Sequence, residues 1–105
     1  MGEWDSLERD FTMVGRWIAE YYAHPEAYCV LPPVRPGDVA AQLPDRAPER
    51  GEPFERIFED FKRIIVPATT HWNHPRFFAY FATSAEPSAV AAEALSATLD
   101  VKAML

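Results

Sequence analysis

The sequence has 105 residues, enough for one domain, and a hydrophobic content of 49% with 13% aromatic residues excludes a disordered chain. The formal net charge of −6 at pH 7 excludes the basic face that binding to nucleic acid requires. No apolar run reaches the roughly 18 residues of a membrane span, so we expect neither a nucleic-acid partner nor a membrane partner.

The first residues and the cysteine content predict a cytoplasmic protein. The opening segment MGEWDSLERD has neither the basic region nor the apolar region of a signal peptide. The single cysteine, Cys29, cannot form an internal disulfide, which is typical of a reducing compartment. Its neighbours Tyr28 and Val30 favour a buried, inert thiol.

The first predicted element is an amphipathic helix over residues 4–23, because apolar side chains recur along it at spacings of three and four. Asp5 and Glu8 have the spacing of a capping box, and Pro25 predicts the end of the helix. Additional apolar residues such as Trp17 widen the apolar face. Two interpretations stay open: a well-buried core helix, or a helix that packs on a partner subunit.

A proline-rich connection follows, with seven prolines between His24 and Pro53. This density favours extended geometry that lies against another surface. Only Asp38–Leu43 predicts a short helical turn, after the turn signal Pro36-Gly37.

Two further helices are predicted, over Phe54–Val66 and from Ser88 onward, with Pro87 in the first turn of the latter. On the first of them Glu59 and Arg63 have the spacing of an exposed ion pair. The second shows no cap or glycine before the sequence ends, which is typical of a chain that continues. The sequence therefore predicts an all-α segment of three to four helices with a proline-rich extended connection.

Groups typical of catalysis or metal binding are sparse. His71 and His74 could share one helical face and hold a metal, but Pro75 follows and no acid or thiol lies nearby, so we predict no metal site. The two lysines, Lys62 and Lys102, lie on a charged helix face and in an apolar run, and neither context is typical of a Schiff-base lysine. We predict no catalytic residue in this chain.

An irregular aromatic stretch over residues 71–83, HWNHPRFFAYFAT, is the most distinctive feature. Composition leaves two interpretations equally open: a core plug beneath a loop, or the wall of a pocket for a flat apolar ligand. In the second interpretation Trp72, Tyr80 and Phe81 form the wall, and the hydroxyl of Thr83 orients one polar group.

The order RIIVPATTHWNHPRFFAYFATSAEP, followed by a helix of small residues, resembles the N-terminal part of the group II pyridoxal-phosphate-dependent amino-acid decarboxylases, most closely their aromatic-L-amino-acid branch. The resemblance covers most of the chain and is strongest from Phe54 onward. It implies a carboxy-lyase parent enzyme with pyridoxal 5'-phosphate as cofactor and the α/β architecture of fold type I. It also implies a homodimer in which this segment reaches over the other subunit.

The same resemblance implies a division of the chain. Residues 1–85 match a helical dimerisation segment that contains the aromatic stretch, and residues 86–105 match the start of a helix leading into the cofactor-binding domain. The family's catalytic and cofactor-binding residues lie beyond Leu105, so none is assigned here, and no cofactor is expected on this chain alone.

The resemblance does assign residues on the substrate side. Positions that line the pocket are matched by Trp72, Tyr80, Phe81 and Thr83, and positions that approach it from the neighbouring subunit are matched by Val101 and Ala103. Ala82 stands where animal aromatic decarboxylases have proline, and Ala103 replaces a bulky aromatic residue. Both differences reshape the pocket and leave the identity of the amino acid open.

Two other hypotheses are retained. The chain could be a non-enzymatic helical self-association module derived from such an enzyme, or a small metal-binding protein that uses His71 and His74.

Overall fold

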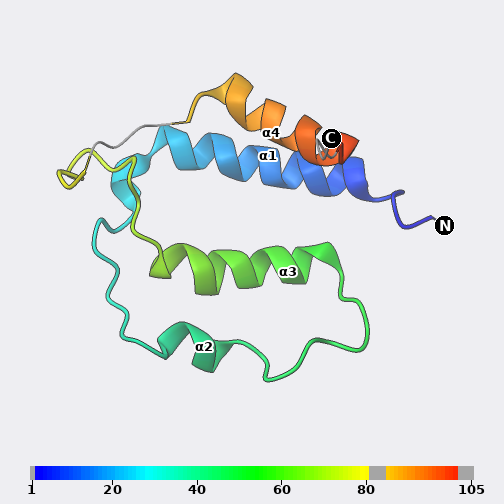
Figure 1. Ribbon diagram of the computed structural model, residues 1–105, viewed down its shortest axis with the longest axis horizontal. Coiled ribbons are helices and arrows are strands. Elements are labelled where there is room, and N and C mark those ends of the chain that lie inside the picture. Colours follow the sequence, from blue (N-terminus) through cyan, green and yellow to red (C-terminus); the bar gives the residue numbers. More distant parts are fainter. Residues whose placement is uncertain (1, 81–84, 102–105) are drawn as a thin grey trace.

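The computed structural model describes residues 2–80 and 85–101, and these residues form helices and no strand (Figure 1). The helices are α1 (Leu7–Ala23), η1 (Pro25–Ala27), α2 (Asp38–Gln42), α3 (Phe54–Asp60), η2 (Phe61–Ile65), η3 (Val66–Ala68) and α4 (Pro87–Leu99). The predicted all-α segment with its proline-rich connection is confirmed. In Figure 1, α1 runs between α4 and α3, and α2 lies on the far side of α3.

Helix α1 begins later than the periodicity predicts, because the residues before it form turns. The carboxylate of Asp5 accepts the backbone amide three residues earlier at 2.8 Å, so it does not cap the helix. Ser6 is the N-cap residue, and its hydroxyl bonds to the Asp10 carboxylate at 3.1 Å rather than to a backbone amide. The predicted capping box of Asp5 and Glu8 is therefore wrong.

The short helix α2 follows the predicted turn at Pro36-Gly37. The amide of Asp38 donates to the Arg35 carbonyl at 3.0 Å, and Gly37 has φ 93° and ψ −16°. Proline at the second position and a left-handed glycine at the third define a type II turn, which a residue with a Cβ would strain.

The predicted helix over Phe54–Val66 is present along its whole length, but its winding changes from α in α3 to π in η2 and then to 3₁₀ in η3. The expected Glu59–Arg63 ion pair does not form. Glu59 is instead paired with Lys62 at 2.6 Å, and Arg63 is paired with Asp60 at 3.0 Å.

Helix α4 starts at Pro87 as predicted, but it has a stop signal that the sequence analysis missed. Asp100 adopts the left-handed conformation with φ 47°, and its amide donates to the Ser96 carbonyl at 3.2 Å. Aspartate tolerates this conformation better than most residues, so it can close a helix where no glycine is present.

The core is small and lies almost entirely along α3 and its continuation. The buried apolar side chains among the described residues are Phe58, Ile64 and Val66. Helix α1 packs against them through Trp17, whose ring meets Phe61 edge-on with centroids 5.4 Å apart and meets Phe58 in the same way at 6.3 Å. No residue of α1 is fully buried.

The chain is far more open than a compact domain of its mass. Its accessible surface is 9355 Å², whereas a compact monomer of 11.9 kDa exposes about 6,000 Å². Its radius of gyration is 16.5 Å, whereas about 13 Å is typical for a compact domain of this length. Another protein surface could cover this additional accessible area.

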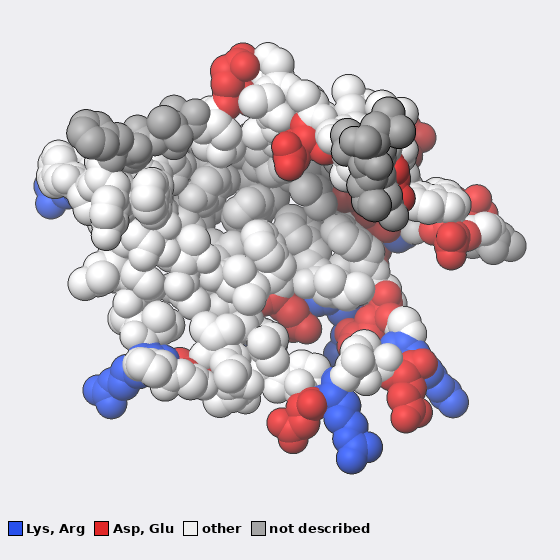
Figure 2. Space-filling model, in the orientation of Figure 1, with Lys and Arg blue, Asp and Glu red and all other residues white. Residues whose placement is uncertain are grey.

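Much of this exposed surface is uncharged. Figure 2 shows a broad area without charged side chains over the middle of α1 and α3, while charges gather around the loop that connects α2 to α3. Exposed large apolar side chains occur on two neighbouring helices, namely Leu7 and Phe11 on α1 and Leu95 and Leu99 on α4. Patches of this kind are typical of surfaces that bind another protein.

The small core gives a stability prediction. Phe58 is 7% exposed and Phe78 is 87% exposed. We expect Phe58→Ala to lower the free energy of unfolding by about 3 kcal/mol, because a buried ring is lost and a cavity remains. The matched control Phe78→Ala should change it by less than about 0.5 kcal/mol. Urea unfolding followed by circular dichroism measures both, and equal losses in the two variants would contradict this description of the core.

Candidate functional site

A chain of polar contacts lies at the base of the aromatic stretch. His71 is 4% exposed and is the only buried polar residue among those the structure describes. Its Nδ1 lies 2.6 Å from the hydroxyl of Tyr21 on α1, and its Nε2 lies 2.9 Å from the carbonyl oxygen of Val66 in η3. His71 therefore connects the first helix to the end of the long central helix.

Aromatic rings surround this connection. Tyr28 lies beside the His71 ring with centroids 4.9 Å apart, and Tyr21 lies beside it at 5.5 Å. Tyr21 also stacks on Trp17 at 5.1 Å. The polar contact therefore lies on the aromatic side of the α1–α3 core, where it is partly buried.

Burial changes the acidity of Tyr21. Loss of solvation raises the pKa of its hydroxyl above the ordinary value of 10.0, and the charges that Tyr22 and Tyr28 acquire on ionisation raise it further. The neutral phenol is therefore the form that the fold stabilises, and this form retains a proton to donate.

The first part of the aromatic stretch forms a stack of three rings. Trp72 stacks with both Phe77 and Tyr80, with centroid distances of 4.8 Å and 5.6 Å, and the Trp72 and Tyr80 planes differ by only 7°. Trp72 is 47% exposed and Tyr80 is 82% exposed. A flat, accessible pair of rings of this kind is suited to contact a flat apolar group.

Tyr80 holds this position in an unusual backbone conformation, with φ at 42°. A non-glycine residue in the left-handed region carries about 1 kcal/mol or more of strain, and such residues cluster at functional sites. The conformation therefore singles out Tyr80 within the stretch.

The structure brings together only some of the residues assigned by resemblance. Trp72 and Tyr80 are stacked on each other. Val101 follows the C-terminal end of α4, which in Figure 1 lies at the opposite side of the molecule from the end of the 71–80 segment. The remaining assigned positions, Phe81, Thr83 and Ala103, lie outside the described residues.

The side chains considered for metal or cofactor chemistry are engaged elsewhere. Both ring nitrogens of His71 have protein partners, and His74 Nδ1 accepts the amide of Arg76 at 2.9 Å. In the described ranges no group of three or more potential metal ligands occurs. Lys62 is paired with Glu59 at 2.6 Å and lies over the Phe58 ring at 4.7 Å, so its amine is already engaged with neighbouring side chains.

Cys29 is exposed, which contradicts the predicted buried thiol. Apolar neighbours in the sequence do not bury a residue in an extended connection, because that segment has no core of its own.

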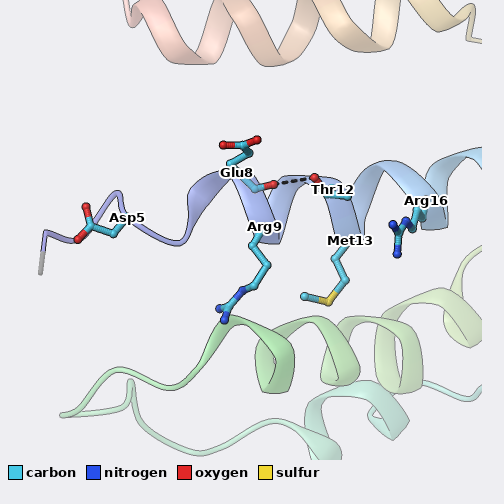
Figure 3. A pocket seen from close by; sticks show the side chains of 6 residues that line it. All are labelled: Asp5, Glu8, Arg9, Thr12, Met13 and Arg16. Carbon is cyan, nitrogen blue, oxygen red and sulfur yellow. Dashed lines mark hydrogen bonds between the residues drawn. The ribbon is translucent and has the colours of Figure 1, made fainter.

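Three surface hollows of about 500 Å³ are lined by residues of α1, and two of them are relevant to the site. One is lined mostly by polar side chains, from Asp5 before α1 and from Glu8, Arg9, Thr12, Met13 and Arg16 on α1 (Figure 3). There Arg9 points toward α3, where it pairs with Glu55 at 3.2 Å, and the hydroxyl of Thr12 donates to the Glu8 carbonyl at 2.8 Å. These contacts are structural, and neither Trp72 nor Tyr80 lines this hollow.

The second hollow lies between α1 and α4 and is almost wholly apolar. Its lining includes Gly15, Ile18 and Tyr22 from α1 and Pro87 and Val90 from α4. The sequence analysis missed it, although the glycine on α1 and the small residues of α4 are the signal that marks it. It has no group that could carry out chemistry and is a surface for packing.

Comparison with known proteins places these features in a family. The pyridoxal-dependent decarboxylase conserved domain matches residues 36–104. Tryptophan decarboxylase TDC2 of Camptotheca acuminata is 46% identical over 79 residues, covering 75% of this chain. Aromatic-L-amino-acid decarboxylase of Drosophila melanogaster is 41% identical over 93 residues, covering 87% of this chain.

A solved structure gives the same result for the fold. The crystal structure of Rhodiola rosea 4-hydroxyphenylacetaldehyde synthase superimposes on 90% of this chain with a TM-score of 0.82 and 40% identity. The chain therefore belongs to the family of pyridoxal-dependent decarboxylases. It spans 16% and 18% of the length of the two curated relatives and 20% of the crystallised chain.

The raised pKa of Tyr21 gives a prediction about pH. Because folding favours the neutral phenol, the contribution of Tyr21 to stability is complete below about pH 10 and is lost as the pH rises through the raised pKa. We expect the urea midpoint of the wild-type chain to fall more steeply above about pH 10 than that of Tyr21→Phe. The control Tyr80→Phe, at an exposed tyrosine, should keep the wild-type slope. A Tyr21→Phe chain with an unchanged slope would contradict the assignment.

Proposed function

We propose that this chain is the N-terminal part of a pyridoxal-phosphate-dependent decarboxylase that acts on aromatic amino acids. The observation that carries the proposal is the stacked, accessible pair of Trp72 and Tyr80 in a chain that belongs to this family. Two of its relatives bear the names of decarboxylases of tryptophan and of aromatic L-amino acids, which supports the same substrate class.

In this proposal the aromatic stretch forms part of the wall that holds the substrate's side chain. The nearly parallel rings of Trp72 and Tyr80 offer a face against which an aromatic side chain can stack. Phe81 and Thr83 are proposed to continue the wall, and Val101 and Ala103 to contribute from the other subunit. The wide separation of the α4 end from the aromatic stretch supports their belonging to different pockets (Figure 1).

The chemistry of the reaction is proposed to come from parts of the enzyme outside this chain. Pyridoxal phosphate supplies an electron sink when carbon dioxide leaves an amino acid. Lys62, the lysine among the described residues, is held by Glu59 and does not fit the role of cofactor anchor. This segment is proposed to bind and orient the side chain and to exclude water around it, with no catalytic residue and no cofactor of its own.

The proposal includes a homodimer. The surface excess of the open chain and the exposed apolar residues of α1 and α4 support a second copy as the covering partner. Residues 1–85 would supply dimer contacts, and residues 86–105 would lead into the cofactor-binding domain. Sedimentation equilibrium of the protein expressed from its native gene should give the mass of two chains, and a monomer would contradict this part.

Location is proposed to be cytoplasmic. The single cysteine supports a reducing compartment. Among the described residues no helix is long and apolar enough to cross a membrane.

A second candidate is a non-enzymatic helical self-association module derived from such an enzyme, which the open apolar surface would equally support. The two candidates differ in whether the protein expressed from the native gene decarboxylates an amino acid.

The wall proposal predicts a defect in substrate binding. With the protein expressed from its native gene, we expect carbon dioxide and an amine from tryptophan, tyrosine or dopa. Trp72→Ala should raise KM about tenfold, because about 1.4 kcal/mol of ring stacking is lost. The control Trp4→Ala, at an exposed tryptophan before α1, should leave KM unchanged. An inactive wild-type protein would favour the self-association module, and an aldehyde product would place the protein with the aldehyde synthases.

A further inference from the structure

His71 differs from the residues of the proposed pocket wall, because it is buried and contacts two helical elements. It is buried, it comes directly before Trp72 in the chain, and its two ring nitrogens reach two different helical elements. Buried polar side chains are costly unless every donor and acceptor is paired. The pairing of these nitrogens therefore fixes where the ring, and the backbone that carries it, can lie.

One nitrogen holds the end of the central helix. A carbonyl oxygen can only accept, so Nε2 carries a proton and donates it to Val66. The same oxygen also accepts the amide of Thr69 at 3.2 Å, and the Thr69 hydroxyl donates to the Ile65 carbonyl at 2.7 Å. His71 thus completes the cap on the last carbonyls of the helix.

The other nitrogen holds α1. With Nε2 protonated, a neutral ring has Nδ1 as an acceptor, and the hydroxyl of Tyr21 donates to it at 2.6 Å. A ring with one protonated nitrogen satisfies both of these bonds, and no acid pairs with His71 among the described residues. The raised pKa of Tyr21 keeps its hydroxyl proton available for this bond.

Asn73, which follows Trp72 in the sequence, also contacts the Tyr21 hydroxyl. Its side-chain oxygen lies 3.0 Å from the Tyr21 hydroxyl, and its amide nitrogen is buried without a partner. The single phenolic proton is already donated to His71, so a half-turn of the carboxamide lets the amide nitrogen donate to the Tyr21 oxygen. In this orientation the nitrogen donates to Tyr21, the carboxamide oxygen takes the position that has no partner, and both neighbours of Trp72 are attached to one hydroxyl.

We infer that His71, fixed by Tyr21 and Val66, is the positioning residue of the aromatic wall: it sets the place of Trp72 and, through the stack, of Tyr80. The inference rests on the proposed function for its role in substrate binding. His71 itself does not contact the substrate. Trp72 is held because the residues on both sides of it, His71 and Asn73, are bonded to the Tyr21 hydroxyl.

The test reads the surroundings of Trp72 directly. The protein expressed from its native gene is labelled with 5-fluorotryptophan, and the ¹⁹F resonance of Trp72 is assigned by its loss in Trp72→Phe. Tyr21→Phe keeps the ring and removes only the hydroxyl, so we expect the Trp72 resonance to shift or broaden. The control Tyr28→Phe removes a hydroxyl that has no hydrogen bond among the described residues, beside the same histidine, and should leave the resonance in place.

Activity provides the second readout. Tyr21→Phe should raise KM for the aromatic substrate about fivefold with kcat changed less than about twofold, because the wall is displaced while the chemistry is not. His71→Asn should act in the same direction, and if it does not fold, Tyr21→Phe decides alone. An unchanged Trp72 resonance in Tyr21→Phe overturns the inference. A moved resonance in a protein without decarboxylase activity upholds the positioning of Trp72 and rejects the proposed function instead.

Discussion

The contact between Tyr21 and His71 is the interaction on which the arrangement of this chain depends. It joins α1 to the segment that follows the central helix, two parts of the chain fifty residues apart. The apolar side chains buried in the described residues come from one continuous helical stretch, so they cannot by themselves fix where α1 lies. A hydrogen bond to the buried His71 ring adds direction to the aromatic packing around it, because it is satisfied in only one relative placement of the two elements.

Because the core is small, much apolar surface remains exposed and can contact another protein. Among the described residues only a few apolar side chains are buried, while large apolar residues on α1 and α4 remain exposed. A compact domain would bury these residues, but here α3 and then α2 follow below α1, on the side away from α4 (Figure 1). The open form is therefore suited to a segment that wraps over another protein surface. The hydrogen bonds of His71 to Tyr21 and Val66 would keep α1 and the central helix in place within this segment.

Periodicity and proline positions predicted the helices well, since the spacing of apolar residues reports directly on a helix face. The ends were predicted less well. Asp5 and Asp100 have side chains and backbones that can serve several local roles, and only three-dimensional contacts decide between them. The exposure of Cys29 was missed for a similar reason, because apolar neighbours say nothing about which segments lie over a core.

The family was recognisable from the motif around Trp72, and the comparisons confirm that recognition. The role of His71 was not predictable from the same motif. Its sequence context suggested an ordinary polar histidine, and its partners Tyr21 and Val66 are identified only when α1 and η3 come together. The pocket-lining assignments of Trp72 and Tyr80 stay predictions, although the structure stacks the two rings on each other.

A double-mutant cycle between Tyr21→Phe and His71→Leu tests the central interaction most directly. Urea unfolding of the wild-type chain, the two single variants and the double variant gives the coupling energy between the hydroxyl and the imidazole. If their hydrogen bond fixes α1 on the central helix, the coupling should be about 1 kcal/mol or more. Strictly additive losses, with a coupling near zero, would contradict the account and leave aromatic packing alone as the link between the two helices.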